Sequence, residues 1–312
     1  MIYIFTFTGE FGYELLNWRS VIKKFKTISS ENKIICCSRK GFQNMYDDSI
    51  CDEYIDISEL ERFKNSEADQ YQCLPVVDGA GTRINADLHQ KQLEDDVKML
   101  VYNTFNVHEF EHKFIFSHTP ISLKGLQFGS GRIYSSEILS NNEYSKIATN
   151  SNTKQLLESR LGFSLDSNYT LIQTAYRHTV RRSKVKLDHE KLFNYFETDT
   201  KLVLLNFNTN RFNDSFSKFN NTDRILISVD NFDEQSCLIN NADKCVFLTE
   251  GDFRSHNYVP PLLGKNVISV APKDVLDLPS SPIKFWNENV FKFGGQIIPL
   301  EYEQLIKDID GK

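Results

Sequence analysis

Short apolar runs that alternate with segments of helical period constrain this fold more than any other feature. Residues 2–7 are β-branched and aromatic, and apolar side chains then recur at helical spacing over residues 15–25. The sequence predicts further strands over 33–37 and 53–57, with a short helix over 41–46 between them. Strands that alternate with helices form a parallel sheet covered by helices. We therefore expect the chain to begin with a Rossmann-like unit.

The second half of the sequence repeats this alternation more regularly. It predicts five strands, over residues 169–173, 201–206, 224–229, 245–248 and 266–270, with helices over 152–161, 188–197, 233–240 and 254–263. This pattern is typical of a second Rossmann-like sheet. The segment from 61 to 150 is less regular: it contains one predicted helix, over 87–105, and is either an insertion or the edge of the first domain.

Length and composition agree with a two-domain α/β protein. The 312 residues are about twice a typical domain of roughly 150 residues. The polar run at 149–153 is the candidate linker. We predict two Rossmann-like domains that face a cleft, one over residues 1–150 and one over 151–312.

Charge and apolar content limit the partners. The net charge of −6 would repel a nucleic-acid backbone, so nucleic acid is not expected as a partner. The sequence shows no leader peptide and no apolar run near the roughly 18 residues that cross a bilayer. We expect a cytoplasmic protein with at most peripheral membrane contact.

The six cysteines form no CxxC pair, which argues against structural zinc and favours reduced thiols.

The first candidate site is the loop after the first strand. Gly9 and Gly12 allow close backbone approach to a ligand, and the carboxyl end of a strand is where open α/β sheets bind ligands. The loop matches neither a Walker motif nor GxGxxG. Alternatively, the glycines serve a tight turn, with Glu10 and Glu14 stabilising the helix N-terminus. The other candidate residues of this loop are Phe11 and Tyr13.

The second candidate site is a basic segment directly after the strand at 169–173. Five Lys or Arg residues fall within residues 177–186 of an otherwise acidic chain. Arginine forks suit a diphosphate, so the segment predicts an anionic ligand, with a solvated charged loop as the alternative. Its candidate residues are Arg177, His178, Arg181 and Arg182.

The third candidate site lies between the strand at 245–248 and the helix that follows. It contains Glu250, Ser255, His256 and Asn257, all capable of hydrogen bonding. Free backbone N–H groups at a helix start can also hold phosphate. The only Asp-x-Asp sequence, at 308–310, follows no core strand, and we predict it to be a solvated, frayed tail.

Together these three segments resemble GT-B glycosyltransferases, in particular fucosyltransferase-like and bacterial surface-polysaccharide transferases. The resemblance implies that the first loop faces the cleft from an acceptor-side N-terminal domain. It also implies that the basic segment meets the phosphates of the donor, and that residues 246–270 meet its nucleotide and sugar.

The expected function is sugar transfer from a nucleotide-activated donor to a hydroxyl of a glycan or polysaccharide. Glu10 is the expected general base, with Glu250 as the second choice. We expect no metal and no cofactor beyond the nucleotide sugar, because the basic segment supplies the charge. A sulfo- or pyruvyl-transferase with an anionic donor, or a noncatalytic carbohydrate-binding protein, stays open as an alternative.

Overall fold

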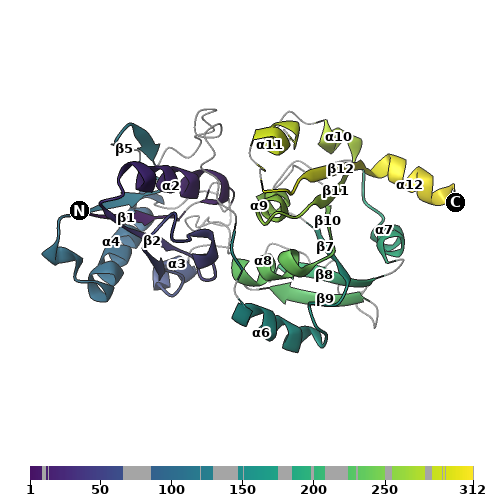
Figure 1. The fold of residues 1–312 in the computed structure, drawn as a ribbon, viewed down its shortest axis with the longest axis horizontal. Helices are drawn as coiled ribbons and strands as arrows, with labels where there is room; N and C mark the ends of the chain where they lie inside the picture. The colour runs from purple at the N-terminus through teal and green to yellow at the C-terminus, as the bar shows by residue number, and fades with distance from the viewer. Residues whose placement is uncertain are drawn as a thin grey trace. The chain divides into compact units, whose positions relative to one another are not determined.

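The computed structural model divides the chain into two compact units, Met1–Ser145 and Lys146–Lys312 (Figure 1). The description below covers residues 1–8, 12, 14–65, 86–119, 121–128, 147–149, 151–174, 185–197, 200–207, 224–229, 231–249, 255–277, 283–289, 291 and 293–311. The boundary predicted between residues 150 and 151 lies a few residues after the division between the units.

The first unit is built on a four-stranded parallel sheet in the order β3-β2-β1-β4. Its strands are β1 (Ile2–Thr6), β2 (Lys33–Ser38), β3 (Glu53–Asp56) and β4 (His112–Phe116). The helical elements are η1 (Glu14–Trp18), α2 (Arg19–Ile28), η2 (Gln43–Met45), α3 (Glu61–Asn65), α4 (Ala86–Thr104) and η3 (Val107–Glu109). A small antiparallel hairpin joins β5 (Ile121–Leu123) to β6 (Leu126–Phe128).

Apolar side chains cover both faces of this sheet. On one face, the α4 residues Leu93, Val97 and Val101 pack in a buried cluster with Ile4 and Ile35. On the other face, the rings of Phe5, Trp18, Phe25 and Phe128 contact one another at centroid distances of 5.1–6.1 Å. The apolar side chains of residues 15–25 that predicted a helix face are all buried: Leu15, Leu16, Trp18, Val21, Ile22 and Phe25. Both faces being covered is typical of a parallel sheet.

The second unit contains a six-stranded parallel sheet in the order β12-β11-β10-β7-β8-β9. Its strands are β7 (Tyr169–Thr174), β8 (Lys201–Phe207), β9 (Arg224–Val229), β10 (Lys244–Leu248), β11 (Val267–Ala271) and β12 (Ile297–Glu301). The helices are α6 (Ser151–Leu161), α7 (His189–Phe196), α8 (Phe232–Asn241), η5 (Ser255–Tyr258), α9 (Val259–Leu262), α10 (Lys273–Leu276), α11 (Ile283–Asn289) and α12 (Tyr302–Asp310).

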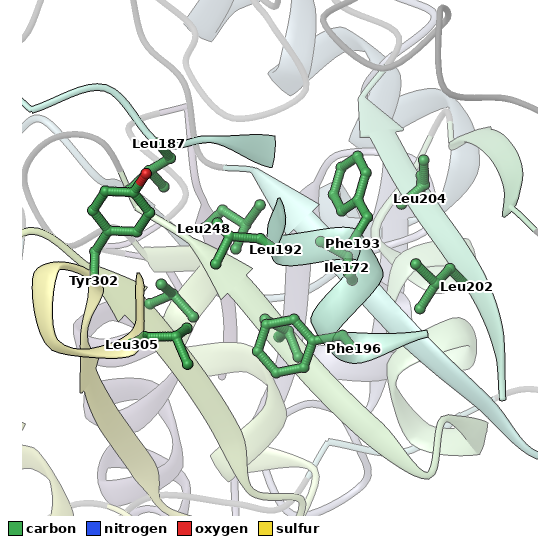
Figure 2. Packing of buried hydrophobic residues seen from close by; sticks show 12 residues of the cluster. Ile172, Leu187, Leu192, Phe193, Phe196, Leu202, Leu204, Leu248, Tyr302 and Leu305 are labelled. Atoms are coloured by element: carbon green, nitrogen blue, oxygen red, sulfur yellow. The ribbon is translucent and has the colours of Figure 1, made fainter. Parts of the chain in front are cut away.

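The core of the second unit lies between this sheet and two helices (Figure 2). Leu192, Phe193 and Phe196 of α7 and Tyr302 and Leu305 of α12 are buried against the sheet. They contact alternate residues of the central strands, namely Ile172, Leu202, Leu204, Val246, Leu248 and Val270. Side chains two apart along a strand share one face, so the residues between them face the opposite side. That opposite face carries the polar residues described below.

Several elements differ from the sequence prediction, among them two edge strands and the C-terminal helix. The irregular segment before residue 150 supplies β4, which is an edge of the first sheet, and residues 297–301 form β12, an edge of the second. The predicted frayed tail is wrong for its backbone, because residues 302–310 form α12. Asp310 is exposed there and forms an ion pair with Lys191 at 2.7 Å. No helix within the described ranges is long and apolar enough to cross a membrane.

Candidate functional sites at two sheet edges

In the first unit, the chain after β1 leaves the sheet at the point where the strand order reverses. The chain runs from β1 to β2 and β3 on one side, and then returns to place β4 on the other side of β1. The Ser117 N–H donates to the carbonyl of Thr6 at 2.9 Å, and the Thr8 N–H donates to Ser117 Oγ at 3.1 Å. Open parallel sheets bind ligands at such a reversal. The glycine-bearing loop therefore starts at the expected ligand position of this unit.

Glu14, two residues after Gly12, is completely buried at the carboxyl end of β2. Its carboxylate accepts hydrogen bonds from Ser38 Oγ, from Arg39 Nη1 at 2.7 Å and from Tyr46 Oη at 2.6 Å. The side chain of Glu14 has no exposed surface, and that of Arg39 is 2% exposed. Burial raises the pKa of Glu14, while Arg39, Ser38 and Tyr46 act in the opposite direction.

Aromatic rings surround the guanidinium of Arg39. Its Cζ lies 5.8, 5.5 and 5.9 Å from the ring centroids of Phe7, Phe42 and Phe63, respectively. A cation in such surroundings is attracted by the ring faces but has lost its water. Arg19 at the start of α2 is a second buried cation in this region, and burial lowers its pKa to about 10. The first unit therefore concentrates buried charge around Glu14, the residue that follows the glycine-bearing loop in the sequence.

In the second unit, strand order reverses between β7 and β10. The chain adds β8 and β9 on one side of β7, and then β10, β11 and β12 on the other. Leu248 of β10 is level with Thr174 of β7, so these strands end together. The basic segment from Arg177 follows β7, and the segment with Glu250 follows β10. The two segments predicted to bind the donor therefore follow the two neighbouring strands, β7 and β10, between which the strand order reverses.

A buried polar cluster lies at this edge, on the face opposite the apolar core. Gln173, Thr249, Asn257 and Ser269 are each completely buried. Gln173 and Ser269 both lie level with Phe247, on either side of it in the sheet. Ser269 Oγ donates to Asn257 Oδ1 at 3.0 Å, and Gln235 Nε2 donates to Gln173 Oε1 at 3.2 Å.

Three atoms of this polar cluster keep unused hydrogen-bonding capacity. Within the described part of the chain, Gln173 Nε2, Thr249 Oγ1 and Asn257 Nδ2 are buried without a hydrogen-bond partner. An unsatisfied buried polar group costs about 1–3 kcal/mol, and native proteins keep few of them. At the edge where open α/β sheets bind ligands, such groups are typical of positions that a ligand or an ordered water satisfies.

The structure describes the predicted site residues unevenly. Gly12 is half-buried at the helix start, and Asn257 is buried within η5. Ser255 and His256 belong to the same 3-10 helix, and only their backbone is described. The following predicted residues lie wholly outside the described residues: Gly9, Glu10, Phe11, Tyr13, Arg177, His178, Arg181, Arg182 and Glu250.

Sequence reasoning missed most of the polar residues that the two edges bring together. Gln173 and Ser269 lie inside apolar strands, where an isolated polar residue is itself a signal. Arg39 directly follows β2, and the carboxyl end of a strand was the available clue. Nothing in the local sequence indicates that Glu14 pairs with it, because the partners are brought together only by the sheet.

Comparison with known proteins adds information on the fold. No family model and no curated protein matches the chain. A glycosyl transferase family 9 structure from Veillonella parvula is 10% identical with a TM-score of 0.50, over 99% of this chain and 88% of that one. The E. coli ADP-heptose lps heptosyltransferase II is 9% identical with a TM-score of 0.49, over 100% and 98% of the two chains. The E. coli heptosyltransferase WaaC with ADP is 11% identical with a TM-score of 0.48, over 100% and 99%.

The likeness to the family 9 structure shows the fold of this protein. The two α/β units, one with a parallel sheet of four strands and one with a parallel sheet of six, form a GT-B-type architecture. The expected fold class of two Rossmann-like units is confirmed.

Proposed function

We propose that this protein is a metal-independent glycosyltransferase that moves a sugar from a nucleotide-activated donor to a hydroxyl of a glycan or surface polysaccharide. One observation carries the proposal. Gln173 of β7, Thr249 after β10 and Asn257 beside β11 have buried polar atoms without a partner among the described residues, and a basic segment follows β7. The neutral groups suit the uncharged parts of a ligand, and the basic segment suits its phosphates.

The chemistry of donor cleavage explains why both kinds of group are needed. When a sugar leaves its nucleotide, negative charge develops on the departing phosphate, and positioned cationic donors stabilise that charge. Arg177 and Arg181 are the proposed cationic groups, and His178, Arg182 and the η5 residues Ser255 and His256 are proposed as further contacts to the donor substrate. In this proposal the arginines take the role that a divalent metal has in other transferases, and no cofactor besides the donor is needed.

The first unit is proposed to bind the acceptor. Its glycine-bearing loop leaves the sheet at the reversal between β1 and β4 and contains Glu10. A carboxylate there can remove the proton of the acceptor hydroxyl as the sugar is transferred. Gly9, Phe11, Gly12 and Tyr13 would then shape the acceptor side, while Glu250 is the second candidate for the base. The proposed setting is the cytoplasm, with a glycan acceptor as partner.

A nucleotide panel tests the proposal most directly. The melting temperature of the protein is measured with ADP, GDP, UDP, CMP and CDP, and with an activated sulfate donor and phosphoenolpyruvate as representatives of other anionic donors. A ligand present at 100 times its Kd stabilises by about 2.7 kcal/mol, which is easily measured as a melting shift. We expect one nucleotide to shift melting well beyond the rest. A shift with phosphoenolpyruvate or with a sulfate donor alone would instead favour a pyruvyl- or sulfotransferase. No shift with any nucleotide would favour a carbohydrate-binding protein.

A further inference from the structure

Glu14 stands out among the charged residues that the proposed reaction does not use. It is the first residue of η1 and follows the glycine-bearing loop directly. Its carboxylate has no exposed surface, so Glu14 cannot itself contact an acceptor or donor. Its hydrogen-bond donors come from two other segments: Ser38 and Arg39 at the end of β2, and Tyr46 just after η2.

The ion pair is a costly way to stabilise a core. Removing two charges from water costs several kcal/mol per ion, and well-packed apolar residues at such places are often as stable or more so. The guanidinium of Arg39 already lies among three phenyl rings, and an apolar side chain could fill the space between these rings equally well. What the ion pair adds is a fixed position for the side chain of Glu14, because a carboxylate that accepts hydrogen bonds from three donors can take only one orientation.

That position fixes the end of the glycine-bearing loop to the sheet. At its start the loop is tied to β4 through Thr8 and Ser117, and Gln90 of α4 donates to Thr8 Oγ1 at 3.4 Å. At its end Glu14 is tied to β2 through Arg39. The five residues between Thr8 and Glu14 that the acceptor-side proposal needs therefore have a polar anchor at each end, Thr8 at the start and Glu14 at the end.

We propose that Glu14, held by Arg39 and Tyr46, is a positioning residue that places the glycine-bearing loop, and with it Glu10, for catalysis. The inference rests on the proposed function of the loop. Because the donor is assigned to the second unit, loss of this positioning lowers kcat and leaves the KM for the donor unchanged.

The test uses the double variant E14Q/R39M, which removes both charges of the ion pair together. We expect kcat to fall by about 10- to 100-fold, on the scale of the penalty for misplaced groups, with the donor KM within about twofold of wild type. The single variant Y46F, which keeps the ion pair and removes one tether, is expected to lower kcat by a smaller factor. Y46F also carries the test if the double variant does not fold.

Val101→Ala is the matched control for stability. Val101 is completely buried in the α4 cluster of the same unit and has no part in the proposed site. It should lower the melting temperature while kcat stays within about twofold of wild type. If E14Q/R39M and Y46F keep kcat at the level of V101A, Glu14 is only a structural residue and the inference is overturned.

A second measurement separates this inference from the proposed function. Chymotrypsin cleaves after aromatic residues, and the loop contains Phe11 and Tyr13. We expect cleavage at these two bonds to be at least several-fold faster in E14Q/R39M than in V101A under conditions where both are folded. This holds whether or not the wild-type protein transfers a sugar. Faster cleavage together with no nucleotide binding by the wild type would refute the glycosyltransferase proposal while supporting the role of Glu14; equal cleavage rates would refute that role.

Discussion

Asn257 accepts a hydrogen bond from Ser269 at 3.0 Å, and both side chains are completely buried. The bond uses the oxygen of the Asn257 amide, which leaves Nδ2 to point elsewhere with no partner in the described part of the chain. Ser269 thus fixes which way the amide faces. The amide Nδ2 beside β11 is therefore a hydrogen-bond donor held in one orientation, and the described residues contain no acceptor for it.

We predict that Asn257→Ala weakens nucleotide binding by about 1–3 kcal/mol, the cost of leaving a buried polar partner unsatisfied. The variant also leaves Ser269 Oγ without its acceptor, so it should be less stable than wild type. The double variant N257A/S269A removes that second effect. Calorimetric titration and urea unfolding of both variants separate the two roles. Recovery of stability with binding still weak is the expected result, whereas recovery of both would make Asn257 purely structural.

Replacing Arg177 or Arg181 by Ala is predicted to reduce donor binding or transition-state stabilisation by about 1.5–3 kcal/mol, the range for hydrogen bonds to charged groups. Lysine at the same position should restore only part of the loss, because it lacks the planar fork of arginine. Steady-state kinetics with the nucleotide identified by the panel provides the measurement. Normal kinetics in both alanine variants would exclude the basic segment from the site.

Glu10→Gln keeps the shape of the side chain and removes its basicity. A positioned general base contributes about 10²- to 10⁴-fold, so kcat should fall within that range while the affinity for the donor stays the same. Glu250→Gln, made in parallel, is the comparison. Turnover that survives in E10Q and disappears in E250Q would move the base to the second unit.

Gly295→Ala is predicted to destabilise the second unit by about 1–3 kcal/mol, as overpacking does. A Cβ at this position would overlap the carbonyl oxygen of Lys265 and would lie 2.8 Å from Cα of Pro261. Both neighbours are backbone atoms, which cannot move aside cheaply. Gly311→Ala is the control, because its Cβ would come no closer than 3.2 Å to the carbonyl of Lys307. Urea midpoints should place G295A clearly below G311A; equal midpoints would contradict the close approach.

The buried cysteines are predicted to be unreactive in the native protein. Burial raises the pKa of Cys37 to about 12 and that of Cys245 to about 12. At pH 8 the thiolate fraction of such a group is on the order of one part in ten thousand, and the thiolate is the reactive form. Because the unfolded thiols ionise near pH 9, while the native ones keep their protons until about pH 12, these groups also lower stability as pH rises above 9.

The measurement is thiol titration of the Cys73→Ser variant, since Cys73 lies outside the described residues. The five other thiols, all buried, should react slowly at pH 8 and completely in urea. Rapid reaction of two or more of them in the native state would show that the cores open more readily than the packing indicates.

Much of the fold follows from the sequence because its strands are apolar, β-branched runs of ordinary length. The exceptions have physical reasons. Strand β12 contains Pro299, which cannot donate in a sheet ladder and is tolerated here because β12 is an edge. Strand β4 is an edge as well, and its burial alternates only partly.

The candidate sites were less predictable than the fold, since their partners are distant in the sequence. The loops after strands could be recognised from glycine and arginine content. The pairing of Glu14 with Arg39 and of Asn257 with Ser269 depends on which strands are neighbours. Strand order is a property of the assembled sheet, and local pattern carries little of it.

The position of β4 beside β1 has a consequence for how the first unit acquires its loop. Pairing joins Ile2 to His112, and most of the unit's sequence lies between them. Contacts between residues so far apart in the sequence form slowly, because the chain loses the entropy of loop closure before the contacts stabilise it. The tie between Thr8 and Ser117 depends on that pairing. A nascent or partly unfolded chain can therefore contain β1, β2 and the Glu14–Arg39 contact and still lack the Thr8–Ser117 anchor at the start of the glycine-bearing loop.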